Sequence, residues 1–116
     1  MEEINKEEQK RLLKARGICV VIPTYNNEKT IEKVVRDTLL QCDDVIVVND
    51  GCTDRTAQIL DEIDGITVVS YPRQKFSSFR QKPQNRGKGY ALKQGFRKAL
   101  EMGFAYAITL DGDETA

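Results

Sequence analysis

Residues 18–48, ICVVIPTYNNEKTIEKVVRDTLLQCDDVIVV, contain two short apolar runs separated by one amphipathic segment. The runs, Ile18 to Ile22 and Val45 to Val48, are rich in β-branched residues and do not alternate with polar ones. Such runs are typical of strands covered on both faces, as in a parallel sheet between helices. From Ile31 to Leu39 apolar positions recur at helical spacing, with Asn27 as a candidate N-cap. The stretch therefore predicts a strand, a helix and a second strand.

The same alternation continues to the end of the chain. Further apolar runs lie at residues 66–70 and 106–110, and further amphipathic segments lie at 54–63 and about 89–102. Thr53 is a candidate cap for the second helix and Gly103 for the end of the third. One face of the third helix is expected to carry Ala91, Leu92, Gly95, Phe96, Ala99 and Leu100. Alternating strands and helices predict an α/β fold, an open and mainly parallel sheet built from βαβ crossovers.

Composition is that of an ordinary globular protein, with 40% hydrophobic and 31% charged residues in a chain of 116. Eighteen basic residues balance eighteen acidic ones, so charge gives no argument for nucleic acid as a partner. Three cysteines beside apolar segments favour buried thiols in a reducing compartment. Residues 1–16 form a charged leader, expected to be helical or disordered, and residues 17–116 one domain. With no long apolar run, we expect a cytoplasmic location.

Ligands of open parallel sheets bind beyond the carboxyl ends of the strands. The first run is followed by Pro23-Thr-Tyr-Asn-Asn-Glu28, which is either a simple polar turn or part of a site. In a site, the Tyr25 ring can stack on a base, and the Glu28 carboxylate can accept from a base or ribose. The second run is followed by Asn49-Asp-Gly-Cys-Thr-Asp54. There we interpret Asp54 as a helix-start residue and Asp50 as a candidate partner of a base N–H.

The connection after the third run is strongly basic. It contains Arg73, Lys75, Arg80, Lys82, Arg86 and Lys88 and no acidic residue. It is either a solvated loop or, with Phe76 and Phe79, a contact for an anionic lipid acceptor or membrane surface. Its end, Asn85-Arg-Gly-Lys-Gly89, leads into a helix N-terminus, where backbone N–H groups together with Arg86 or Lys88 favour a phosphate.

The fourth run is followed by Asp111-Gly112-Asp113. Two carboxylates so close together repel each other unless a cation lies between them. A hard divalent ion answers that need, because it prefers oxygen ligands and the phosphates of a substrate. The alternative is a solvated acidic turn.

Taken in this order, the four motifs resemble the donor-binding half of family 2 glycosyltransferases, a group that includes dolichyl-phosphate mannose synthases. The resemblance extends from Ile18 to Glu114 and implies a GT-A fold, truncated after the fourth strand. It also implies a nucleotide-diphospho-sugar donor, UDP- or GDP-linked. The implied site consists of Pro23, Thr24, Tyr25, Glu28, Asp50, Arg86, Gly87, Lys88, Asp111, Gly112 and Asp113. In it, Asp111 and Asp113 correspond to the DxD motif and bind Mg²⁺ or Mn²⁺.

The resemblance further implies inverting transfer of the sugar to a lipid-phosphate, glycan or other hydroxyl acceptor, with the parent enzyme at the cytoplasmic membrane face. Members of the family take their general base from a later region, so we expect it beyond Ala116 and expect the isolated chain to bind donor weakly without turnover. The fourth strand is then an exposed edge through which the chain self-associates. The rival hypotheses are a non-catalytic nucleotide-binding module and, with less support, a sugar nucleotidyltransferase.

Overall fold

The computed structural model describes residues 5–71 and 87–113. Its elements, in chain order, are α1 (Lys6–Ala15), β1 (Ile18–Thr24), α2 (Ile31–Leu39), β2 (Val45–Asn49), α3 (Thr56–Asp61), β3 (Ile66–Ser70), α4 (Lys88–Glu101) and β4 (Tyr106–Thr109). The strands form one sheet in the order β3-β2-β1-β4, and each neighbouring pair is parallel. The α/β fold with an open parallel sheet is therefore confirmed.

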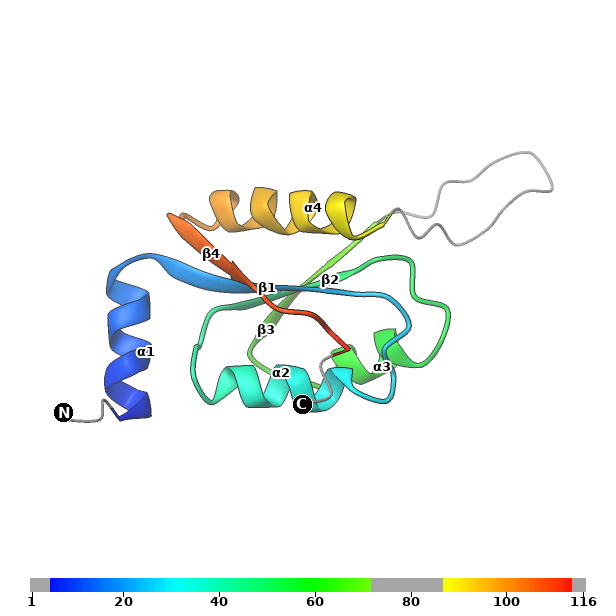
Figure 1. Ribbon diagram of the computed structural model, residues 1–116, viewed down its shortest axis with the longest axis horizontal. Coiled ribbons are helices and arrows are strands. Elements are labelled where there is room, and N and C mark those ends of the chain that lie inside the picture. Colours follow the sequence, from blue (N-terminus) through cyan, green and yellow to red (C-terminus); the bar gives the residue numbers. More distant parts are fainter. Residues whose placement is uncertain (1–4, 72–86, 114–116) are drawn as a thin grey trace.

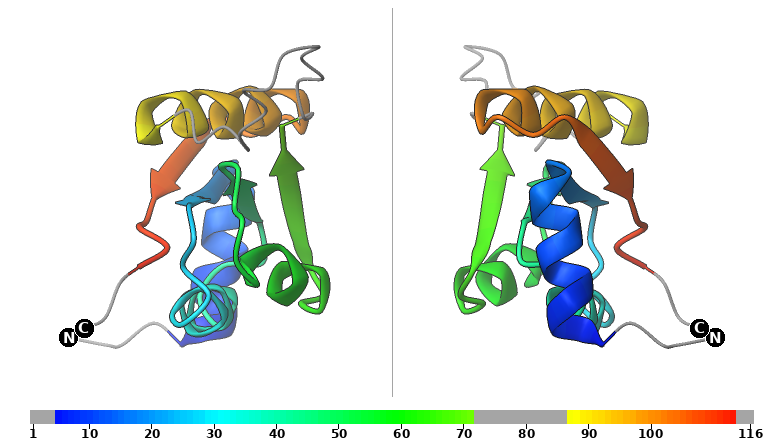
Figure 2. Two further views of the ribbon diagram at one scale, coloured as in Figure 1. Left: turned by 90° about the vertical axis from the view of Figure 1, so that its right-hand side faces the viewer. Right: turned by 90° about the vertical axis from the view of Figure 1, so that its left-hand side faces the viewer.

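The sheet lies between two layers of helices (Figure 1). Helix α4 covers one face and helices α2 and α3 cover the other, while α1 stands beside the start of β1 (Figure 2). Side chains of the central strands alternate between the two layers. Val20, Ile22, Val45 and Val47 pack toward α2 and α3, and Cys19, Val21, Ile46 and Val48 pack toward α4. Both faces of β1 and β2 are thus buried, which explains their continuous apolar runs.

The outer strands differ from the expectation of cover on both faces, which is wrong for β3 and β4. Both lie at the margins of the sheet, where their exposed side chains are on the α2 and α3 face: Ile108 is in register with Val20 and Val68 with Val47. Val68 of β3 and Tyr106 and Ile108 of β4 are exposed. The expected apolar face of α4 is likewise only partly buried, because Phe96 and Leu100 remain 40% and 73% exposed.

Small residues allow α4 to lie close to the sheet. Its buried positions are Ala91, Gly95 and Ala99, one per turn. A Cβ added at Gly95 would lie 2.4 Å from Cγ1 of Val21 and 3.1 Å from Cγ2 of Val48, so no side chain fits there without displacement. The helix therefore has a fixed height above the sheet at its middle turn.

The end of α4 follows the expected pattern. Gly103 has a φ of +87° and donates its N–H to Leu100 O at 3.0 Å, and Phe104 N–H donates to Ala99 O at 2.9 Å. These two bonds form a Schellman cap, for which glycine is favoured because φ is positive. The predicted role of Gly103 is confirmed.

Two helix starts lie later than predicted. Helix α2 begins at Ile31 after Thr30, and not after Asn27, because the Asn27 side chain is engaged in the preceding turn. Helix α3 begins at Thr56, whose N–H donates to Asp54 Oδ1 at 2.9 Å. Asp54 is thus a helix-start residue as expected, whereas Thr53 is not the cap.

The basic segment 73–86, for which contact with an anionic lipid or membrane surface is one hypothesis, lies outside the described part of the chain. Within residues 5–71 and 87–113, no helix has the length and apolarity needed to cross a bilayer.

Candidate functional site

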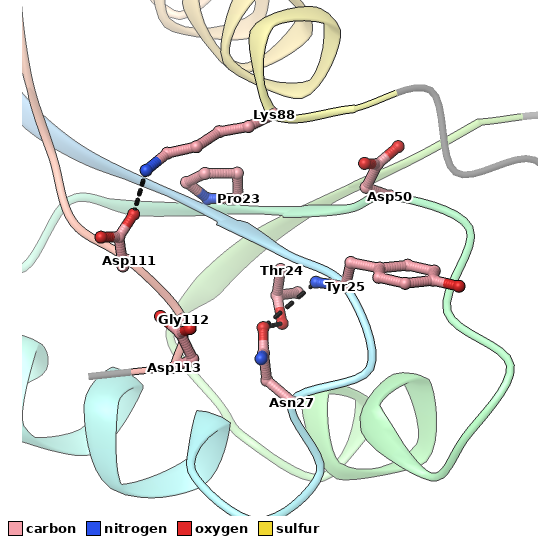
Figure 3. Close-up of a pocket in the computed structure, with 9 residues that line it drawn as sticks. All are labelled: Pro23, Thr24, Tyr25, Asn27, Asp50, Lys88, Asp111, Gly112 and Asp113. Atoms are coloured by element: carbon pink, nitrogen blue, oxygen red, sulfur yellow. Dashed lines mark hydrogen bonds and ion pairs between the residues drawn. The ribbon is translucent and has the colours of Figure 1, made fainter. Parts of the chain in front are cut away.

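The carboxyl ends of β1, β2 and β4 surround a cavity of about 290 Å³ (Figure 3). Its lining consists of Pro23, Thr24, Tyr25, Asn27, Asp50, Lys88, Asp111, Gly112 and Asp113. Of the site residues expected from the sequence, Glu28 and Gly87 are not part of the lining, and Arg86 lies outside the described residues. The four strand-end motifs therefore contribute to one site through the remaining residues.

One side of the cavity carries an aromatic ring and a carboxylate. Tyr25 is half exposed, whereas Asp50 is only 3% exposed. Both lie away from the two aspartates that follow β4 (Figure 3). The backbone N–H of Asp50 donates to Thr24 O at 2.9 Å, which joins the ends of β1 and β2. This side offers a stacking surface beside a buried hydrogen-bond acceptor.

Asn26 fastens the connection after β1 to the connection after β2. Its Oδ1 accepts from the backbone N–H of Thr53 at 2.8 Å and of Asp54 at 3.3 Å, and its Nδ2 donates to Thr53 Oγ1 at 3.2 Å. Its φ is +50°, in the left-handed region that asparagine tolerates better than most residues. We define these contacts as the Asn26 clasp. They fix the spacing of the two connections that present Tyr25 and Asp50.

Asp54 strengthens the same junction. Its Oδ2 accepts from the backbone N–H of Glu28 at 3.3 Å. Burial opposes the charge of the Asp54 carboxylate, but hydrogen bonds donated by Thr56 and Glu28 outweigh burial and lower its pKa. Asp54 is therefore ionised at neutral pH and acts as an acceptor for two backbone segments.

The turn after β2 is closed by its own side chains. Asn49 Oδ1 accepts from the backbone N–H of Cys52, three residues later, at 3.0 Å. Cys52 Sγ lies 3.5 Å from Thr24 O as a donor, and burial raises the pKa of its thiol, so the proton is retained at neutral pH. Asn49 thus stabilises the turn from which Asp50 reaches the cavity.

Asn27 is a lining residue that sequence reasoning assigned only to a helix cap. Its Oδ1 accepts from Thr24 Oγ1 at 2.7 Å and from Tyr25 N–H at 3.1 Å (Figure 3). The Thr24 hydroxyl is thus used within the turn, and Thr24 contributes to the cavity as a buried wall. The available signal was an asparagine shortly after a strand end, a position that favours side-chain bonds to nearby backbone.

The other side of the cavity carries the two aspartates after β4. The side chains of Asp111 and Asp113 are exposed, whereas Gly112 between them is buried. Lys88, the first residue of α4, extends across the cavity and forms an ion pair with Asp111 (Figure 3). This hydrogen bond, together with the charge of Asp111, raises the pKa of Lys88, so its ammonium group remains charged at neutral pH.

These residues fit a divalent cation that shares its coordination with a substrate. Asp111 already holds a cationic group, the Lys88 ammonium. Among the described residues no three His, Cys, Asp or Glu side chains gather as metal ligands, so the donors are two carboxylates beside an open cavity. Mg²⁺ commonly binds in this way, through one or two carboxylates, waters and substrate phosphates.

Comparisons with known proteins agree on one family. The sequence profile described as "Glycosyl transferase family 2" matches residues 19–116. The chain is 33% identical over 103 residues to UDP-N-acetylglucosamine–dolichyl-phosphate N-acetylglucosaminyltransferase of Methanococcus voltae, covering 83% of this chain and 41% of that protein. It is 28% identical over 113 residues to poly-β-1,6-N-acetyl-D-glucosamine synthase of Staphylococcus aureus, covering 95% and 25%. The chain thus spans well under half the length of these relatives.

A solved structure shows the same architecture. Glucosyl-3-phosphoglycerate synthase of Mycobacterium tuberculosis, in complex with UDP, is 26% identical with a TM-score of 0.65. The match covers 99% of this chain and 40% of that one. Other crystals of the same enzyme contain UDP with Mn²⁺ or Mg²⁺, and two contain Mn²⁺, UDP-glucose and phosphoglyceric acid. The likeness confirms the GT-A fold that the four motifs imply.

Proposed function

Because the chain belongs to glycosyl transferase family 2, we propose that its cavity binds a UDP-linked sugar, with a divalent cation, as the donor of an inverting glycosyltransferase. The observation that carries the proposal is the arrangement within one cavity. The pair Tyr25 and Asp50 lies on one side, and Lys88 with Asp111 and Asp113 lies on the other. A nucleoside diphosphate carries matching groups in the same order, with a flat base at one end and two phosphates at the other.

On the base side, Tyr25 stacks on the uracil ring, and the Asp50 carboxylate accepts a hydrogen bond from the uracil N3–H. Because Asp50 is 3% exposed, water competes little for this bond. A carboxylate is an acceptor only, so it selects a base that presents a donor. Uracil is proposed over guanine because the relatives named above include a UDP-N-acetylglucosamine enzyme and an enzyme crystallised with UDP.

On the phosphate side, Asp111 and Asp113 hold Mg²⁺ or Mn²⁺. The cation, when bound, supplies positive charge that stabilises the diphosphate as it leaves the sugar. Lys88 adds a second positive charge, and it stands at the N-terminus of α4, where backbone N–H groups also favour phosphate. Binding of the donor moves the Lys88 ammonium from Asp111 to a phosphate oxygen.

The acceptor is proposed by class only. An oxygen of the acceptor attacks the anomeric carbon from the side opposite the leaving diphosphate, which inverts its configuration. The M. voltae relative is named for dolichyl phosphate, and the M. tuberculosis enzyme was crystallised with phosphoglyceric acid. A lipid-phosphate or glycan acceptor is proposed for the full enzyme on this basis.

Calorimetric titration of the chain with UDP, GDP and CDP, each with and without Mn²⁺, tests the proposed donor. UDP is expected to bind at least about 10-fold more tightly than CDP, because cytosine lacks the N3–H that Asp50 would accept. Mn²⁺ is expected to tighten UDP binding by a further factor of about 10 or more. Equal affinities for the three nucleotides, or affinities that are the same with and without Mn²⁺, would contradict the proposal.

The free edge of β4 is proposed as a surface for self-association. In the described part of the chain, β4 pairs with β1 along one edge, and its Tyr106 and Ile108 side chains are exposed. Unpaired strand edges are templates for pairing with another chain. Sedimentation velocity is expected to show a dimer of the 116-residue chain that Ile108→Lys dissociates. Val68→Lys, on the opposite edge of the sheet, is the matched control. A monomer at all concentrations would reject the idea.

A further inference from the structure

The backbone between the two aspartates is held by a residue outside the four motifs. The hydroxyl Oγ1 of Thr30 donates a hydrogen bond to Gly112 O at 2.8 Å, joining positions 82 residues apart in the sequence. The same hydroxyl lies 3.5 Å from Asn27 O. Because a hydroxyl has one proton, the shorter contact to Gly112 is the stronger bond.

Thr30 occupies a helix-cap position without making the usual cap bond. It immediately precedes α2, where a threonine side chain commonly accepts from a backbone N–H of the first turn. No such bond is formed by Thr30. Its hydroxyl is directed instead to the segment that follows β4. The Thr30 hydroxyl therefore stabilises the Asp111–Asp113 turn and not the N-terminus of α2.

Close packing fixes the same peptide from another direction. A Cβ added at Gly112 would lie 3.0 Å from Asn27 Oδ1 and 3.1 Å from both Cβ and Oγ1 of Thr24. Gly112 is buried against these two side chains, while the flanking carboxylates are exposed. The connection from β1 to α2 thus provides both a hydrogen bond and a surface for the turn that bears the aspartates.

We propose that Thr30 is a positioning residue for the divalent cation: its hydroxyl fixes the Gly112 peptide so that the Asp111 and Asp113 carboxylates converge on one ion. The inference rests on the proposed function, in which these carboxylates are the metal ligands. Small divalent cations demand defined ligand geometry, and outer residues that orient the ligands commonly change metal affinity by about 10–100-fold. Without the Thr30 bond, two mutually repelling carboxylates on an exposed turn separate.

The test compares Mn²⁺ affinity with nucleotide affinity in the 116-residue chain. Thr30→Val keeps the branched shape and removes the hydroxyl. It is expected to weaken Mn²⁺ binding by about 10–100-fold, while metal-free UDP binding changes by less than about 2-fold, because Tyr25 and Asp50 are held by the separate Asn26 clasp. Thr30→Ser restores the hydroxyl and is expected to restore Mn²⁺ affinity.

Two further variants separate positioning from general stability. Thr38→Val removes a hydroxyl that donates to Val34 O at 2.7 Å within the same helix, and it is expected to leave Mn²⁺ affinity unchanged. Gly112→Ala displaces the same turn by crowding Asn27 and Thr24, and it is expected to weaken Mn²⁺ binding as well.

The inference is overturned by wild-type Mn²⁺ affinity in Thr30→Val, by parallel loss of metal-free UDP binding, or by failure of Thr30→Ser to rescue. If Asp111→Asn abolishes Mn²⁺ binding while Thr30→Val does not, the metal site stands and only the role of Thr30 is rejected. If the unsubstituted chain binds neither Mn²⁺ nor UDP, the proposed function fails, and the role of Thr30 is rejected with it.

Discussion

Replacing Asp111 or Asp113 by asparagine is expected to remove the Mn²⁺-dependent part of UDP binding. Each substitution keeps the size of the side chain and deletes one negative charge from the pair proposed to hold the cation. Loss of a direct carboxylate ligand exceeds the effect of a supporting residue, so Mn²⁺ affinity should fall by at least about 100-fold. Binding of UDP without metal should persist, because the proposed contacts with its base are at Tyr25 and Asp50. Titration of each variant with Mn²⁺, and with UDP at fixed Mn²⁺, measures both quantities.

Stability should change little in these variants, which makes the result easy to interpret. Asp111 pairs with Lys88, but both side chains are more than half exposed, so water screens the pair and its loss should affect stability little. Asp37→Asn is a matched control, because it removes an exposed carboxylate of α2 that pairs with Lys33. If Asp37→Asn weakened Mn²⁺ binding as strongly as Asp111→Asn, the effect would be one of overall charge and the site assignment would be wrong.

Replacing Gly95 by alanine is expected to be the most destabilising small substitution in α4. The new methyl group would lie 2.4 Å from Cγ1 of Val21, a fully buried side chain in the middle of β1. Overpacking of a core typically costs about 1–3 kcal/mol, and this contact favours the upper end. Removing glycine from a helix interior returns about 1 kcal/mol. The net loss of about 2 kcal/mol should lower the thermal midpoint by roughly 10 °C.

Gly89→Ala provides the matched control in the same helix. A Cβ at Gly89 would meet no atom within 4 Å, so only the gain in helix propensity remains. This variant should be as stable as the unsubstituted chain or more stable by up to about 1 kcal/mol. Thermal and urea unfolding of the two variants would measure the difference. Equal stabilities would show that α4 shifts freely above the sheet and that Gly95 does not set its height.

Sequence pattern was sufficient for the central part of the fold and for the main residues of the cavity. Continuous apolar runs identified β1 and β2, because burial on both faces removes the polar alternation. Their carboxyl ends, with that of β4, then placed Tyr25, Asp50 and Asp111 at one edge by topology alone. The grouping of these residues followed from the order of elements, without any side-chain geometry.

The remaining features depend on tertiary contacts that no local pattern contains. Phe96 and Leu100 were expected on the same face of α4 as Gly95, but each directly follows a buried position and so lies about 100° around the helix from it, where it stays exposed. The sequence pattern indicated Asn27 as a helix cap. Its actual bonds to Thr24 and Tyr25 form only in the folded turn, so the pattern did not predict them. Thr30 gave no signal, since its partner Gly112 lies 82 residues away.

The Asn26 clasp has a consequence for how such a protein can diversify. It joins the connections after β1 and β2, whereas the aspartate turn after β4 is attached through Thr30 and the packing of Gly112. The two attachments share no hydrogen bond. Changes of the Tyr25 and Asp50 side chains can therefore alter the proposed base pocket while the Thr30 bond to Gly112 stays in place. A chain of this design can change the side chains proposed to contact the base and keep the attachment of its aspartate turn.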